Sequence, residues 1–249
     1  MINSNNISII FCKLYVNMKD ISHFSKKILP EKPMGLRDLT ELGAERVARI
    51  SQELTSGFNF LMKYDRSVTF FGSARFAEGH PYYEKARELA GKIVRELGYS
   101  VLTGGGPGIM GAANQGALEA GGNSLGITIK LPDEQKTNIF LTDHLDLYYF
   151  FTRKVCLSFS AEAFVFFPGG FGTLDEFFEI ITLVQTKKIK DVPIILVGVE
   201  YWKGLEEFMI RHLLDIGTVD NSDLNLYIMS DDENEILEII KNATIRNEN

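Results

Sequence analysis

This chain of 249 residues has only two cysteines, so no framework of disulfide bonds is expected. So little cysteine is typical of a reducing compartment, and we expect a cytoplasmic protein. Long apolar runs are also missing: none approaches the roughly 20 residues that a membrane-spanning helix requires. The most apolar early stretch, residues 6–16, is interrupted by Lys13. We therefore expect no membrane partner.

Positive charge is in short supply as well. The 26 Lys and Arg residues face 33 Asp and Glu residues, which gives a net charge of −7. Because binding along a phosphate backbone needs a basic surface, this balance argues against nucleic acid as a partner. A small anionic ligand needs only local positive potential and stays compatible with it. The four histidines are scattered without metal-ligand spacing, so no metal is expected.

Alternating apolar patterns predict an α/β fold. Residues 1–35 predict an N-terminal extension, and residues 36–249 predict a single Rossmann-like domain that starts with a helical region at 36–64. Strands are predicted at 67–71, 99–102, 124–129, 163–167, 192–199 and 226–229. Helices are predicted at 82–97, 109–120, 149–159, 173–186, 201–214 and 232–240, with a polar loop at about 130–141. This alternation predicts a doubly wound, mostly parallel sheet with an N-terminal helical extension.

Two glycine-rich turns each follow a predicted strand and begin a predicted helix: residues 103–110 (TGGGPGIM) and 168–176 (PGGFGTLDE). Glycine lets backbone N–H groups approach a ligand, and a helix N-terminus adds unpaired donors and partial positive charge. A third turn, residues 72–75 (GSAR), offers a hydroxyl and a cation. Ligands bind beyond the carboxyl ends of parallel strands, so the turns together predict a site for an anion, above all a phosphate.

Each of these features also has another explanation, and the first and third turns also fit ordinary tight turns with no ligand. Residues 106–111 match the dinucleotide pattern G-x-G-x-x-G, but Lys130 stands near the place where that site would have an acid. Thr173 and Glu176 have the spacing of a helix capping box, although this leaves the three neighbouring glycines unexplained. Arg153 and Lys154 equally fit a solvated basic pair.

Taken together, these residues resemble the LOG ("lonely guy") family of cytokinin riboside 5′-monophosphate phosphoribohydrolases. Residues 168–176 resemble the family signature P-G-G-x-G-T-x-x-E, and Arg153-Lys154 falls where the family has its Arg-Lys pair. Residues 103–110 match the T-G-G-G-x-G-I-M turn of the family. The resemblance covers about residues 68–240, and the N-terminal helical region is similar to that of the longer bacterial members.

The resemblance implies hydrolysis of the N-glycosidic bond of AMP or an N6-modified AMP, giving free base and ribose 5-phosphate without a cofactor. It implies that Glu176 stabilises an oxocarbenium-like transition state and that Arg153 keeps Glu176 ionised. It further implies that the following residues bind substrate: Gly72, Ser73, Gly105, Gly106, Glu134, Lys154, Gly169, Gly170, Phe171, Gly172, Thr173 and Thr182. The phosphate would rest on the glycine N–H groups and the Thr173 hydroxyl.

The resemblance also implies a homodimer, or a larger homo-oligomer, with shared active sites. Although the family is often labelled "lysine decarboxylase", no lysine of this sequence is identified as a pyridoxal-phosphate attachment site. The alternative function is a non-catalytic carrier of a phosphate-bearing ligand such as molybdenum cofactor, since similar folds carry that cofactor.

Overall fold

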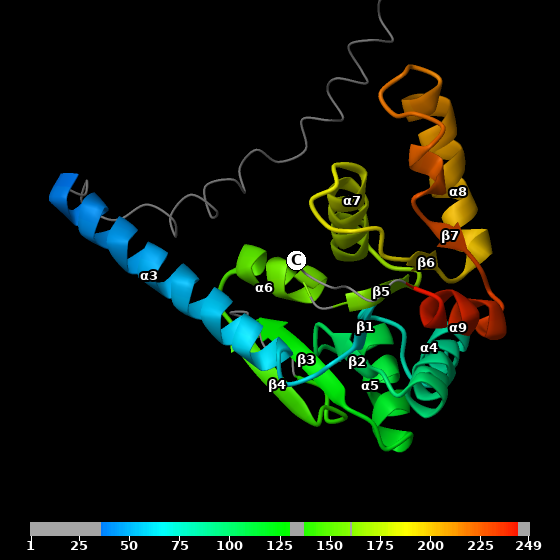
Figure 1. Ribbon diagram of the computed structural model, residues 1–249, viewed down its shortest axis with the longest axis horizontal. Helices are drawn as coiled ribbons and strands as arrows, with labels where there is room; N and C mark the ends of the chain where they lie inside the picture. The colour runs from blue at the N-terminus through cyan, green and yellow to red at the C-terminus, as the bar shows by residue number, and fades with distance from the viewer. Residues whose placement is uncertain (1–35, 130–136, 160, 244–249) are drawn as a thin grey trace, which may run out of the picture. The chain divides into compact units, whose positions relative to one another are not determined.

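A computed structural model describes residues 36–129, 137–159 and 161–243 of the chain. Its centre is a seven-stranded sheet in which every neighbouring pair of strands is parallel, in the order β4-β3-β2-β1-β5-β6-β7 (Figure 1). The strands are β1 (Ser67–Phe71), β2 (Ser100–Thr103), β3 (Ser124–Ile129), β4 (Asp143–Leu147), β5 (Ala161–Phe166), β6 (Ile194–Leu196) and β7 (Ile228–Met229). The predicted doubly wound α/β fold is confirmed.

Helices cover both faces of the sheet (Figure 1). One core lies under α4 (Pro81–Lys92), α5 (Ile109–Glu119) and α9 (Glu233–Lys241). The other lies under α6 (Phe150–Phe159), α7 (Phe171–Gln185) and α8 (Val199–Met209), and it also contains the last residues of α3 (Leu36–Leu61). Because side chains alternate along a strand, β1 and β5 supply both cores, and their residues are apolar with few exceptions.

The predicted helices at 82–97 and 201–214 each end in a π-helical turn, at Ile93–Leu97 and Ile210–Leu214. The first of these ends at Gly98, whose φ of 69° is the left-handed conformation that glycine adopts without strain. Strand β4 is a correction to the sequence prediction, which had no strand there. It lies at the sheet edge, and its half-exposed Asp and His residues give it no apolar pattern.

The chain divides into two compact units, residues 1–48 and 49–249, with the division inside α3. All contacts discussed below belong to the second unit. The predicted boundary at residue 35 stays a prediction, because residues 1–35 lie outside the described residues. No helix in the described ranges has both the length and the apolar character needed to cross a membrane.

Candidate active site

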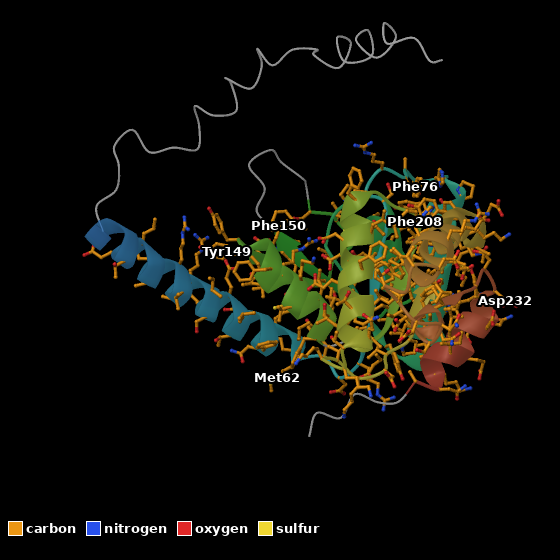
Figure 2. All side chains as sticks on the ribbon, turned by 90° about the horizontal axis from the view of Figure 1, so that it is seen from above. Met62, Phe76, Tyr149, Phe150, Phe208 and Asp232 are labelled. Carbon is orange, nitrogen blue, oxygen red and sulfur yellow. The ribbon has the colours of Figure 1, made fainter. Side chains whose placement is uncertain are left out.

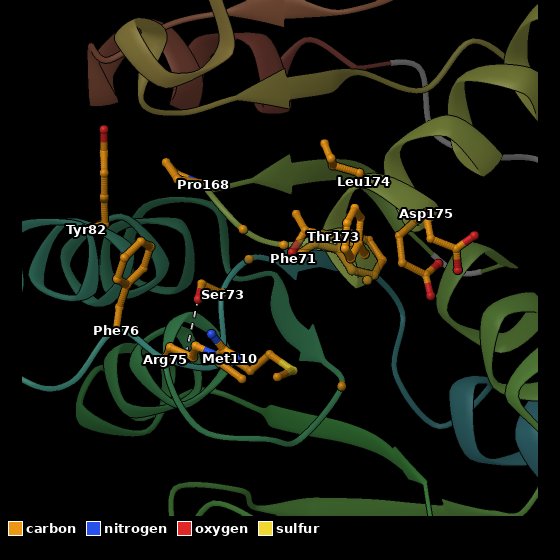
Figure 3. A pocket seen from close by; sticks show the side chains of 18 of the residues that line it. Phe71, Ser73, Arg75, Phe76, Tyr82, Met110, Pro168, Thr173, Leu174 and Asp175 are labelled. Carbon is orange, nitrogen blue, oxygen red and sulfur yellow. Dashed lines mark hydrogen bonds between the residues drawn. The ribbon is translucent and has the colours of Figure 1, made fainter. Parts of the chain in front are cut away.

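The strand order reverses at β1, which pairs with β2 on one side and with β5 on the other. The three predicted glycine turns leave the carboxyl ends of these three strands, where doubly wound sheets open a crevice. A pocket of about 1120 Å³ lies at this point (Figure 3). It brings together nine of the predicted site residues: Gly72, Ser73, Arg153, Gly169, Gly170, Phe171, Gly172, Thr173 and Glu176.

Five predicted site residues are not among those that line the pocket. Glu134 lies outside the described residues. The side chain of Lys154 pairs with Asp175 at 2.9 Å and with Glu179, and the Thr182 hydroxyl donates to the Phe178 carbonyl within α7 at 2.6 Å. Gly105 and Gly106 are buried and are not among the lining residues.

The Gly105 N–H donates to the Thr103 hydroxyl at 2.9 Å, and its donation to a phosphate stays a prediction. Two other glycines of this turn have a packing role. A Cβ on Gly104 would lie 2.0 Å from Nη2 of Arg153, and a Cβ on Gly108 would lie 2.2 Å from the Ser73 carbonyl oxygen. The turn therefore lets the Arg153 guanidinium and the β1 turn come close, so packing explains Gly104 and Gly108 without a dinucleotide.

In the second glycine turn, residues 168–176, some glycines are not explained by packing. Gly169 has a packing role, because a Cβ there would lie 2.0 Å from Oγ1 of Thr173. At Gly170 and Gly172 a Cβ would meet nothing within 4 Å, and neither residue has a positive φ. Neither packing nor backbone conformation requires glycine at these two positions. Both line the pocket, so a ligand lying against the backbone explains them best.

Helix α7 begins at Phe171, with Gly170 as an N-cap that has no side chain to accept a hydrogen bond. The capping-box alternative is therefore wrong: Thr173 lies inside the helix, and its N–H donates to the Gly170 carbonyl at 3.0 Å. The N–H groups of the first helical residues precede the first intrahelical hydrogen bond and point toward the pocket end of the helix. This N-terminus favours a bound anion.

Arg153 extends from the first turn of α6 into the pocket. Its Nε donates to the Ile127 carbonyl at 2.8 Å, and Nη2 donates to the Gly104 carbonyl at 3.2 Å. Burial lowers the pKa of Arg153, and the nearby charge of Glu176 opposes this shift. Both partners are backbone carbonyls, so the guanidinium is held in place while its positive charge remains available to a ligand.

Glu176 lies one turn into α7 and is only 8% exposed. Its Oε2 has no hydrogen-bond partner among the described residues. Burial raises the pKa of Glu176 to about 7; Lys154 and Arg153 lower it, while Glu179 and Asp175 raise it. Arg153 thus favours the ionised form of Glu176, as expected, but burial outweighs the basic pair in setting this pKa. A buried acceptor without a partner is costly unless a ligand or water donates to it.

An aromatic wall at the far side of the pocket was missed by the sequence analysis. Phe76 and Tyr82 lie at one end of the drawn residues and Asp175 at the other (Figure 3). The Phe76 and His80 rings stack with centroids 4.1 Å apart, and the Tyr201 hydroxyl donates to the Gly169 carbonyl at 2.6 Å. These residues follow no motif: three come from residues 76–82 and Tyr201 from α8, and only the fold brings the two segments together.

The site combines a helix N-terminus, a cation and a buried carboxylate in one pocket. No group of three or more His, Cys, Asp or Glu residues that could hold a metal ion occurs within residues 36–129, 137–159 and 161–243. Fold and pocket together define an α/β protein whose pocket lies at the reversal of the strand order and brings a helix N-terminus, which favours anions, close to a buried carboxylate.

Comparison with known proteins gives the family. A family model described as "Possible lysine decarboxylase" matches residues 110–240. Cytokinin riboside 5′-monophosphate phosphoribohydrolase LOG5 of Arabidopsis thaliana is 29% identical over 178 residues, which cover 71% of this chain and 77% of that protein. The LOG3 protein of Arabidopsis thaliana is 30% identical over 149 residues, covering 59% of this chain and 68% of that protein. The chain belongs to this family, the LOG family.

A bacterial relative is named for the same activity, and two solved structures have a similar fold. The cytokinin riboside 5′-monophosphate phosphoribohydrolase of Rhodococcoides fascians is 28% identical over 149 residues, covering 58% of this chain and 74% of that protein. The structural-genomics target TM1055 has a TM-score of 0.54 at 25% identity, covering 71% of this chain and 98% of that one. The molybdenum cofactor carrier protein of Chlamydomonas reinhardtii has a TM-score of 0.52 at 24% identity, covering 71% and 96%, and shares the fold.

Proposed function

We propose that this protein is a phosphoribohydrolase that cleaves the N-glycosidic bond of AMP or N6-modified AMP. The observation that carries the proposal is the buried Glu176 carboxylate, whose Oε2 has no partner and which lies one turn from the open N-terminus of α7. A phosphate at that N-terminus would place the attached ribose beside the carboxylate. The names of the relatives, cytokinin riboside 5′-monophosphate phosphoribohydrolases, support this substrate class.

The 5′-phosphate binds at the beginning of α7. Gly170 and Gly172 leave space for it, the first N–H groups of the helix donate to it, and the Thr173 hydroxyl faces the same pocket. Arg153 adds the positive charge. These phosphate contacts lie away from the glycosidic bond, so their binding energy can orient the ribose for cleavage of that bond.

The glycosidic bond breaks as its electron pair leaves with the base, and positive charge develops at C1′ of the ribose. The ionised Glu176 carboxylate stabilises that charge and holds the attacking water. The water gives its hydroxyl to C1′, and its proton ends on the base, which leaves as the neutral purine. Because this role needs the ionised form, activity rises as pH passes through the pKa of Glu176, about 7.

We also propose a homodimer with shared active sites. The pocket rim supports it: Phe171 is 94% exposed and Phe150 is 58% exposed, and both line the pocket. Large apolar side chains exposed at the mouth of a site indicate a surface that a partner covers. A second copy of the chain would enclose the base while the phosphate stays on α7.

The test is product release from AMP, adenosine and isopentenyl-AMP, with free base followed by chromatography and ribose 5-phosphate by mass spectrometry. Cleavage of AMP with adenosine inert is the expected result, because adenosine lacks the anchoring phosphate. The ratio of isopentenyl-AMP to AMP turnover measures the preference for N6-modified bases. If folded protein cleaves none of the three and copurifies with a fluorescent pterin, it is instead a carrier of a phosphate-bearing ligand.

A further inference from the structure

Helix α6, which carries Arg153, begins in contact with the Glu53 carboxylate of α3, a helix that lies far from it in the sequence. Oε1 of Glu53 accepts the Tyr148 N–H at 2.9 Å, and Oε2 accepts the Tyr149 N–H at 3.2 Å. Oε2 also accepts the hydroxyl of buried Thr152 at 2.7 Å. Tyr149 and Phe150 lie at the beginning of α6 (Figure 2). Both carboxylate oxygens of Glu53 are thus used to hold the start of one helix, where negative charge is favourable.

The two helices stay close along the next turns. A Cβ on Gly57 would lie 2.2 Å from Sγ of Cys156, so only glycine allows this approach. The rings of Phe58 and Phe159 have centroids 4.5 Å apart. Glu53 and Gly57 are one helical turn apart, and so are their partners on α6. Helix α6 therefore has little freedom to slide or rotate against this part of α3.

Arg49 completes the cluster. Its guanidinium lies over the Tyr148 ring at 3.8 Å from the ring centroid, and its Nε lies 3.6 Å from Oε1 of Glu53. The positive charge balances the carboxylate, and the cation–π contact fixes Tyr148. Arg49, one turn earlier on α3, thus helps to fix the Glu53 side chain, and Glu53 in turn fixes the start of α6.

Arg153 directly follows Thr152 in the sequence and must reach two backbone carbonyls, those of Ile127 and Gly104, to enter the pocket. We propose that Glu53 is a positioning residue, which holds the first turn of α6 so that the Arg153 guanidinium stays in the pocket beside Glu176. This inference rests on the proposed function for the role of Arg153 in the reaction. It adds a residue outside the glycine motifs and outside the pocket lining.

An effect of Glu53 on the position of Arg153 can be told apart from an effect on the stability of the fold, because Arg153 changes the pKa of Glu176. The charged groups around Glu176 are Lys154 and Arg153 on α6, and Asp175 and Glu179 on α7. If the first turn of α6 shifts, the Arg153 guanidinium moves away from the carboxylate, and Glu176 titrates at higher pH, while Lys154 stays paired with Asp175 and Glu179. A change that only loosens the fold elsewhere leaves that titration where it was.

The experiment compares Glu53→Ala and Glu53→Gln with Gln52→Ala, an exposed neighbour on the same helix. Each full-length variant is checked for a cooperative thermal transition. We expect Glu53→Ala to lower kcat/KM for AMP about tenfold, because small displacements of a positioned group are costly. Its pH profile is expected to shift to higher pH. Glu53→Gln keeps one acceptor oxygen and is expected to lose less, and Gln52→Ala is expected to match the wild type.

Two further measurements decide the outcome. In an Arg153→Ala background, Glu53→Ala is expected to cause no further loss, since it acts through Arg153; a full additional tenfold loss would overturn the proposal. The Glu176 titration, followed by carboxyl ¹³C NMR, needs no turnover. If the wild type leaves AMP intact, the proposed function fails, and the titration still tests the positioning. An unshifted Glu176 titration in both folded Glu53 variants contradicts it.

Discussion

Burial of Glu176 makes the stability of this protein depend on pH in a direction unusual for a carboxylate. Burial raises its pKa from an ordinary 4.5 to about 7, so the native state holds the proton more tightly than the unfolded chain does. The stabilising contribution is fully present below pH 4.5 and is lost as pH rises through about 7. At about 1.4 kcal/mol per pKa unit, ionised Glu176 costs the native state about 3 kcal/mol at alkaline pH.

The perturbation that isolates this cost is Glu176→Gln, which keeps the shape of the side chain and removes the titration. The assay is thermal unfolding of both proteins at pH 5 and at pH 8.5. The stability of the variant relative to the wild type is expected to increase by about 2–3 kcal/mol between these two pH values. For a unit of this size that increase corresponds to roughly 5–10 °C in Tm.

The contributions of all other titrating groups cancel in the difference in stability between the two proteins, because both proteins contain those groups. A difference in Tm that stays constant with pH would refute the reasoning, because Glu176 would then titrate at its ordinary pKa. A wild type that gains stability over the variant at pH 8.5 would refute it more strongly, since some charge would be holding the ionised form.

The remaining predictions concern turnover and binding. Arg153→Ala is expected to lower kcat/KM for AMP about 10²–10³-fold, the range for loss of a preorganised charge, and a near-normal value would remove Arg153 from the mechanism. Gly172→Ala is expected to keep or raise Tm, since its Cβ meets nothing within 4 Å, while KM for AMP rises; an unchanged KM would move the phosphate elsewhere. Gly104→Ala puts a Cβ 2.0 Å from Nη2 of Arg153 and is expected to reduce kcat, with Gly43→Ala, where nothing lies within 4 Å, as control. Ribose 5-phosphate is expected to inhibit competitively with AMP, whereas ribose, which lacks the phosphate, is expected not to inhibit. Steady-state kinetics at varied AMP concentration measures both.

The fold was predictable because its strands are buried on both faces. Such strands are almost continuously apolar, and turns with glycine or polar residues separate them from amphipathic helices. Strand β4 escaped prediction because it is an edge strand, with His144 and Asp146 exposed on one face and no continuous apolar run. It pairs in parallel with β3, and the Asp146 carboxylate accepts a hydrogen bond from the Thr128 hydroxyl of that strand.

The site was predictable only in part. The glycine turns and the Arg-Lys pair marked the right end of the sheet, but the sequence could not say what each glycine does. Gly104 and Gly108 make room for protein atoms, whereas Gly170 and Gly172 leave open space. That difference depends on residues brought close by the fold. The same holds for Glu53, which is 99 positions before its partner Thr152.

The effect of the surrounding charges on the pKa of Glu176 could not be predicted from the sequence either. A basic pair nearby suggests an ionised carboxylate, and Lys154 and Arg153 do lower the pKa of Glu176, but Glu179 and Asp175 oppose them. With burial as the largest effect, the pKa of Glu176 rises to about 7. Whether desolvation or charge prevails depends on packing, which composition and spacing do not describe.

The measurement that tests the account most directly is AMP turnover by wild type and Glu176→Gln, beside the affinity of each for AMP by calorimetry. The account predicts that the variant loses about 10²–10⁴-fold in kcat, while its affinity for AMP stays within a few-fold because the phosphate rests on α7. Near-normal release of adenine and ribose 5-phosphate by the folded variant would contradict the central role of Glu176.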